Sequence, residues 1–139
     1  DFVLVNETAK YRVRRYWLAG ARKGTSDVFI DNLPGFPDGI SRGDKDLFWL
    51  ALVSPRQQSL DDILPQPFVR KIVMRLPKAA QPAPEKYSHI LGLNRRGEVV
   101  ENLQDPAGGF TEITSVQQFN NQLFVGSLRE EAIGVYDLK

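Results

Sequence analysis

Two polar residues in this sequence occupy equivalent positions in a repeat and could do chemistry. Asp38 lies ten residues before Phe48, and Thr114 lies ten residues before Phe124. If the two aromatic residues belong to corresponding strands, Asp38 and Thr114 lie at the entries of strands that line the same central space. An aspartate there suits a hard cation such as Ca²⁺, which takes several oxygen ligands and prefers anionic ones. The plainer interpretation is that Asp38 and Gly39 form an ordinary turn.

The sequence offers few other groups for catalysis. Its only histidine is His89, and it has no cysteine. A Ser/His/Asp triad, a multi-histidine metal site and a thiolate site therefore cannot be assembled from these residues alone. His89 lies in the apolar segment 87–93, which predicts a half-buried strand residue away from the central space.

Composition narrows the class of protein. The 139 residues are 42% hydrophobic, which is typical of one packed domain. Eighteen basic and seventeen acidic residues give a net charge of +1, so no extended field favours nucleic acid as a partner. No apolar run is long enough to span a membrane. The absence of cysteine fits cytosolic and exported proteins equally, so the compartment stays open.

Short apolar runs recur along the chain. Phe2, Phe48 and Phe124 are 46 and 76 residues apart, and the second interval contains an irregular block of 31 residues, 55–85. Without that block the second interval is 45 residues. This period, built from short strands bounded by turns, is typical of a four-stranded propeller blade.

We therefore predict an all-β fold, a partial β-propeller with a short helical insertion. Residues 1–33 supply strands two to four of one blade, 34–105 a complete blade with the insertion at 55–85, and 106–139 the first three strands of another. Strands of a blade alternate in direction, so the strand entries near Asp38 and Thr114 share one rim with the insertion. A self-contained β-sandwich that merely looks periodic is the alternative.

The inserted block contains signals for two helices. Ser59 to Asp62 is typical of a helix start, and Pro67 suits the first turn of a second helix. The second helix has an apolar stripe with basic residues opposite: Phe68, Val69, Ile72, Val73 and Leu76 against Arg70, Lys71 and Arg75. We expect the stripe to pack on its own domain as a lid over the central tunnel. Contact of residues 67–76 with a membrane surface is the less favoured alternative.

Several motifs, in order, resemble the strictosidine synthase-like family, which includes the adipocyte plasma membrane-associated proteins. They are 6–8 (NET), 11–18 (YRVRRYWL), 24–29 (GTSDVF), 33–40 (LPGFPDGI), 102–108 (NLQDPAG) and 123–128 (LFVGSL). The motifs and the lengths between them agree together, so the resemblance covers nearly the whole chain. It implies a six-bladed propeller related to gluconolactonases and paraoxonases, of which this chain is the C-terminal part, roughly the last two and a half blades.

The resemblance also implies roles for single residues. In the related lactonases the aspartate of a Pro-Asp-Gly stretch is a metal ligand, which assigns Asp38 to a metal, with calcium the expected ion. In strictosidine synthases the catalytic glutamate aligns with Thr114, whose hydroxyl cannot carry that proton at neutral pH. Glu112, on the same strand face by alternation, is a partial substitute or, more simply, a solvated carboxylate at the rim. Asn6 and Glu7 are expected to bond backbone groups at a strand end.

The function implied by the resemblance is that of a full-length, metal-dependent hydrolase of lactones or esters, of lactonase or arylesterase type, with a small-molecule substrate. Strictosidine synthesis is not expected. The alternative is a non-catalytic binding or scaffold propeller. The remaining metal ligands would lie in missing blades. Because a partial propeller has open sheet edges, we expect the 139 residues alone to self-associate or to pair with the missing blades, and to be inactive.

Overall fold

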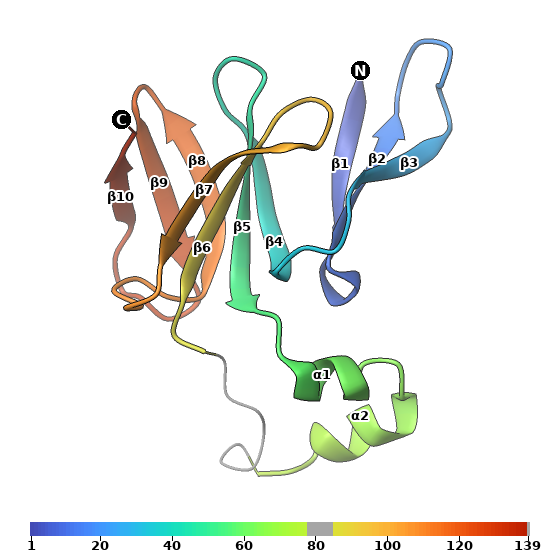
Figure 1. The fold of residues 1–139 in the computed structure, drawn as a ribbon, viewed down its shortest axis with the longest axis vertical. Helices are drawn as coiled ribbons and strands as arrows, with labels where there is room; N and C mark the ends of the chain where they lie inside the picture. The colour runs from blue at the N-terminus through green and yellow to red at the C-terminus, as the bar shows by residue number, and fades with distance from the viewer. Residues whose placement is uncertain (78–84, 139) are drawn as a thin grey trace.

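The chain folds into three antiparallel sheets that stand side by side (Figure 1), in a computed structural model that describes residues 1–77 and 85–138. The first sheet holds β1 (Phe2–Glu7), β2 (Arg12–Trp17) and β3 (Ser26–Ile30). The second holds β4 (Gly35–Arg42), β5 (Phe48–Pro55), β6 (Ser88–Leu93) and β7 (Val99–Asp105). The third holds β8 (Ile113–Phe119), β9 (Gln122–Ser127) and β10 (Gly134–Asp137).

Within each sheet, strands that follow one another in sequence pair, so every sheet is an up-and-down meander of the kind that forms a propeller blade. The predicted all-β, partial propeller-like fold is therefore confirmed. The strands alternate in direction, and Figure 1 shows two rims where their turns gather. The ends of β1 and β5 and the starts of β4 and β8 lie on one rim, and the tight turns after β4, β6 and β8 lie on the other.

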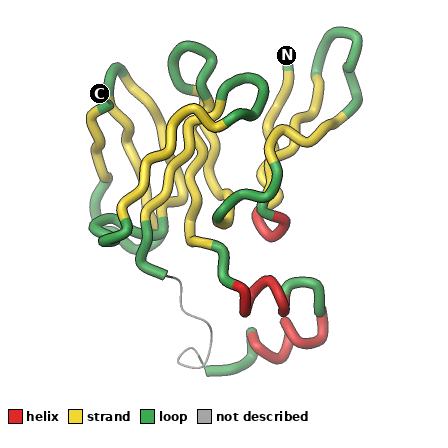
Figure 2. Tube along the Cα trace, in the orientation of Figure 1, coloured by secondary structure: helices red, strands yellow, loops and turns green. Residues whose placement is uncertain are grey.

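The short helices lie at one end of the sheets. α1 (Gln58–Ile63) and α2 (Pro67–Val73) follow β5, and the 3-10 turn η1 (Thr8–Lys10) follows β1. Figure 2 shows α1 and α2 beyond the ends of the strands, on the rim where β4 and β8 begin. The helical insertion is thus confirmed, and α2 begins at Pro67 as predicted. Residues 78–84 of the inserted block lie outside the described residues.

The second sheet is buried on both faces. Along β5, Leu50 and Leu52 enter one hydrophobic cluster with residues of the first sheet, whereas Trp49 and Ala51 enter another with residues of the third sheet. All four side chains are at most 1% exposed. Successive side chains of a strand point to opposite faces, so a continuous apolar run is what a strand between two neighbours requires. The apolar run at 47–50, from which this strand was predicted, is apolar on both faces for that reason.

The first strands of the second and third sheets pack closely together. A β-carbon at Gly39 of β4 would overlap the carbonyl oxygen of Thr114 in β8, so only glycine allows this approach. Two residues further along β4, the Ser41 hydroxyl donates a hydrogen bond to the carbonyl of Val116. The two strand entries singled out in the sequence are therefore neighbours in space.

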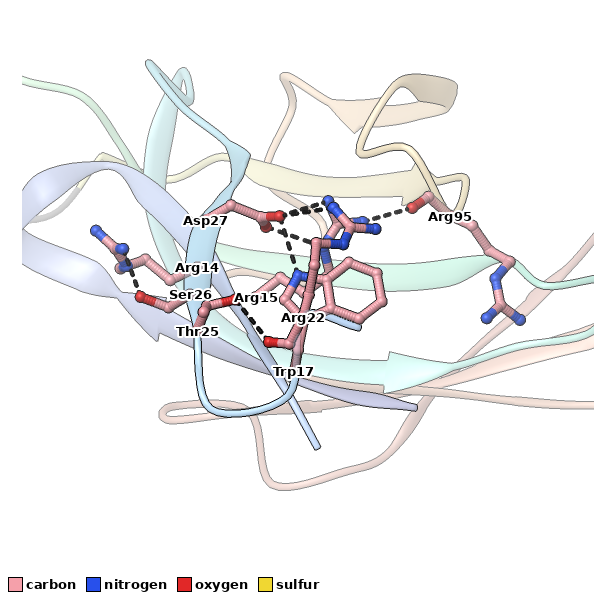
Figure 3. Close-up of polar contacts among 8 residues, drawn as sticks. All are labelled: Arg14, Arg15, Trp17, Arg22, Thr25, Ser26, Asp27 and Arg95. Atoms are coloured by element: carbon pink, nitrogen blue, oxygen red, sulfur yellow. Dashed lines mark hydrogen bonds and ion pairs between the residues drawn. The ribbon is translucent and has the colours of Figure 1, made fainter. Parts of the chain in front are cut away.

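A polar and aromatic cluster joins the first and second sheets (Figure 3). The Arg15 guanidinium binds both carboxylate oxygens of Asp27, at 2.9 and 3.1 Å, and Trp17 Nε1 donates to the same carboxylate at 3.0 Å. Arg15 Nη1 also donates to the carbonyl of Arg95, in the turn between β6 and β7, at 3.0 Å. The guanidinium lies over three aromatic rings, those of Phe2, Trp17 and Phe29. We call Arg15 and these partners the Arg15 cluster.

Arg56 fixes the start of the insertion. Its guanidinium bonds Asp61 Oδ2 of α1 at 2.7 Å and Asn32 Oδ1, between β3 and β4, at 2.8 Å. It also stacks over the Tyr11 ring at 4.3 Å. Leu64, directly after α1, packs against the core between the first and second sheets. These contacts hold α1 to the sheets, and none of them involves α2.

Candidate functional site

Asp38 and Thr114 occupy matching irregularities in β4 and β8. The register of β4 on β5 shifts between Pro37 and Ile40, which brackets Asp38. The register of β8 on β9 shifts between Ile113 and Ser115, which brackets Thr114. β-Bulges of this kind bend a strand and re-aim a side chain, and they are common beside active sites. Both residues singled out by the sequence therefore lie at irregularities in the first strands of their sheets.

The surroundings of Asp38 leave its carboxylate unpaired. No described residue forms a hydrogen bond or ion pair with that carboxylate. Although the residue is exposed overall, partial burial raises the pKa of Asp38 above its ordinary value. A carboxylate that loses water without gaining a partner is a group that a cation would stabilise.

Asn6, at the end of β1, lies against the backbone of Asp38. Its Nδ2 donates a hydrogen bond to the Asp38 carbonyl, which links the first sheet to the entry of β4. Its Oδ1 is buried and has no hydrogen-bond partner among the described residues. An unsatisfied buried acceptor costs free energy unless a donor or a cation reaches it. The sequence marked Asn6 as part of a family motif, but it did not indicate this contact with Asp38.

Glu7 has a structural role. Its carboxylate bonds Lys10 Nζ at 2.8 Å and Arg12 Nε at 2.5 Å. These bonds, chiefly the one from Arg12, lower the pKa of Glu7 from its usual 4.5 to about 2. The carboxylate stays charged and paired at neutral pH, so it closes the turn around η1.

The prediction for Glu112 is wrong in one respect. Glu112 precedes β8 and has a positive φ of 50°, so strand alternation does not carry its side chain to the face of Thr114. Its carboxylate instead forms an ion pair with Arg129 Nε at 2.6 Å. Its carbonyl accepts a hydrogen bond from the Leu128 amide. Glu112 therefore helps to fix the start of β8 against the end of β9.

His89 lies where the sequence predicted, in the third strand of its sheet and away from the strand entries. It is 8% exposed, and its Nε2 lies 2.8 Å from Asn102 Oδ1. Burial lowers the pKa of His89, and the contact with Asn102 opposes that effect in part. A neutral, bonded histidine in the middle of the sheet is a core residue.

The structure thus brings Asp38, Asn6 and Thr114 together on one rim and leaves His89 outside that group. The described residues contain no group of three or more His, Cys, Asp and Glu side chains that could hold a metal ion. The Arg15 cluster lies at the other end of the strands, within a motif that the sequence identified without assigning a role to Arg15. Fold and site together define an all-β, partial propeller-like protein with an acidic position at the entry of a first strand.

Comparison with known proteins specifies the family. No family model matches the chain. It is 36% identical over 145 residues to the protein strictosidine synthase-like 10 of Arabidopsis thaliana, covering 99% of this chain and 38% of that protein. It is 34% identical over 136 residues to the adipocyte plasma membrane-associated protein of Bos taurus, covering 93% of this chain and 33% of that protein. The human protein of the same name is 32% identical over 136 residues.

These matches confirm the resemblance to the strictosidine synthase-like family, which extends over nearly all of this chain. The chain spans about a third of the length of the curated relatives it matches.

Proposed function

We propose that the full-length protein is a metal-dependent hydrolase of lactones or esters and that Asp38 is one ligand of the metal. The observation that supports this proposal is the unpaired Asp38 carboxylate at a bulge in the entry of β4. Asn6 adds a buried and unsatisfied amide oxygen from the side chain that bonds the Asp38 backbone. Carboxylate and amide oxygens are ligands that Ca²⁺ takes in proteins.

The donors in this chain fit part of a calcium site. Ca²⁺ takes roughly six to eight oxygen ligands, and the described residues offer Asp38 and, beside it, Asn6. Other parts of the full-length protein would supply the remaining ligands. When bound, calcium would polarise the substrate carbonyl and stabilise the negative charge that develops on its oxygen.

Other groups at this rim have limited roles in the proposed reaction. Thr114 lines the entry of β8, and its hydroxyl can bond a substrate but cannot act as an acid or base near pH 7. The Glu112 carboxylate, directly before β8, is held in an ion pair with Arg129. We therefore propose that the proton transfers depend on residues outside this chain and that the protein does not synthesise strictosidine.

A non-catalytic binding propeller is the second candidate. The propeller architecture hosts both kinds of function, so the fold does not choose between them.

Titration of the full-length protein with calcium, measured by calorimetry, tests the metal-dependent hydrolase. Asp38→Asn should weaken calcium binding by roughly tenfold or more, because it removes the anionic ligand. Glu101→Gln is the matched control, since Glu101 is an exposed carboxylate in β7. Hydrolysis of aryl esters and lactones should fall in parallel with calcium occupancy. A parent protein that binds no calcium, or equal losses in the two variants, would favour the binding propeller.

A further inference from the structure

The second helix of the insertion exposes a strip of large apolar side chains. Phe68 is 74% exposed and Ile72 is 49% exposed. These residues are four positions apart in α2, so their side chains share one face of the helix. Val69 and Val73, on the neighbouring face, are half-buried. The prediction that the stripe packs on its own domain is therefore wrong for Phe68 and Ile72 within the described residues.

Basic residues without compensating charge lie in this helix and directly after it. Arg70 and Lys71 lie in α2, and Arg75 lies two residues after its end. No acidic residue occurs between Asp62 and Glu85. No ion pair joins these three cations to any other described residue. On the opposite rim some basic residues are paired, as the bonds of Arg95 to Asp46 and of Arg96 to Glu98 show.

The position of the strip limits what can cover it. α2 lies beyond the ends of the strands, whereas a further blade would pack beside the sheets (Figures 1 and 2). α1 is held to the sheets through Arg56, and α2 lies on its outer side. No helix among the described residues is long and apolar enough to cross a membrane. An apolar strip flanked by unpaired cations is the pattern of a helix that lies in a membrane interface.

We propose that α2 docks on an anionic lipid surface, with Phe68 and Ile72 entering the boundary between headgroups and acyl chains. Arg70, Lys71 and Arg75 contact the lipid phosphates, and their long side chains reach the headgroup layer while the helix lies parallel to it. Because α2 lies on the rim where β4 and β8 begin, docking turns the entry at Asp38 and Thr114 toward the membrane. The proposal depends on the exposed helix and not on the reaction.

Flotation of the full-length protein with lipid vesicles tests the surface. We expect binding to phosphatidylcholine vesicles that contain about 30% phosphatidylglycerol to exceed binding to phosphatidylcholine alone by roughly tenfold or more. Phe68→Ser with Ile72→Ser should lower the partition coefficient by at least about tenfold on the anionic vesicles. Arg70→Gln with Lys71→Gln should lower it by roughly fivefold per cation, and added salt should reduce that difference.

Matched controls lie on the opposite rim. Phe119 is 66% exposed, so Phe119→Ser removes a comparable apolar side chain. Lys23→Gln with Arg96→Gln removes two exposed cations. These controls should leave binding within about twofold of the parent. Equal losses in control and test variants, binding that ignores the anionic lipid, or parental binding by the Phe68 and Ile72 variant would each overturn the proposal.

A site-specific readout separates lipid from protein as the cover. An environment-sensitive fluorophore on Phe68→Cys should be in water in the free protein and should shift to the blue when anionic vesicles are added. The same label on Phe119→Cys should not respond. A label at position 68 that is already shielded without vesicles would mean that protein covers α2, and it would overturn the proposal.

Discussion

Replacement of Arg15 by leucine removes the centre of the cluster that joins the first and second sheets. Arg15 is only 14% exposed, and it makes a two-point bond to Asp27, a bond to the Arg95 carbonyl and contacts over three aromatic rings. Hydrogen bonds to charged groups contribute roughly 1.5–3 kcal/mol, and a cation–π contact about 0.5–1 kcal/mol. Leucine recovers some apolar contact, so we expect Arg15→Leu to lower the free energy of unfolding by about 2–3 kcal/mol.

Urea unfolding of the full-length protein, followed by tryptophan fluorescence, measures this change. With a denaturant dependence of ~2 kcal/mol/M, the midpoint should fall by roughly 1–1.5 M. Arg15→Lys should recover little, because the ammonium group cannot bind Asp27 at two points. Arg14→Leu is the matched control, since Arg14 is the neighbour in sequence and, within residues 1–77 and 85–138, its side chain bonds only the Ser26 hydroxyl, at 2.7 Å. A loss for Arg15→Leu no larger than that for Arg14→Leu would refute the role of the cluster.

Three further predictions concern the rim that holds the candidate site. Gly39→Ala forces β4 away from the Thr114 carbonyl, and it should cost about 2–3 kcal/mol in urea unfolding, whereas Gly109→Ala, which meets only a side-chain oxygen, should cost less than about 1 kcal/mol. The pKa of Glu7 is lowered on folding to about 2, so its ion pairs stabilise the fold above pH 4.5, and that stability is lost as the pH falls toward 2. Acid unfolding should therefore be less steep in Glu7→Gln, and identical acid profiles would contradict the role of these ion pairs. Neither the parent nor Thr114→Glu should convert tryptamine and secologanin to strictosidine above background by product chromatography, and turnover by either would show that the assignment of Thr114 is wrong.

The sequence predicted the features that depend on local pattern. The apolar run at 47–50 lies at the start of β5, Pro67 begins α2, and Asp38 and Thr114 both lie at register shifts of their strands. Each of these features repeats or depends on neighbouring residues, so single-chain reasoning can detect it. The strand alternation that placed Glu112 failed because the backbone at that residue is left-handed, which interrupts the period of two.

Features that depend on distant residues could not be found in this way. Arg15 and the Arg95 carbonyl are 80 positions apart, and Asn6 and Asp38 are 32 apart. The sequence around either residue of such a contact gives no sign of its partner. The exposure of α2 was missed for a related reason, since an amphipathic stripe shows that a helix has an apolar face but not what covers it.

The burial of β5 on both faces sets which changes in chain length the protein can tolerate. Inserting one residue within this strand would exchange the two faces, and it would send Trp49 toward the space shaped for Leu50. Two cores would be mispacked by one added residue. The long inserted block, in contrast, begins where β5 ends and leaves the alternation unchanged. Variation in length among relatives should therefore collect at the strand ends, and the spacing within β5 should stay constant.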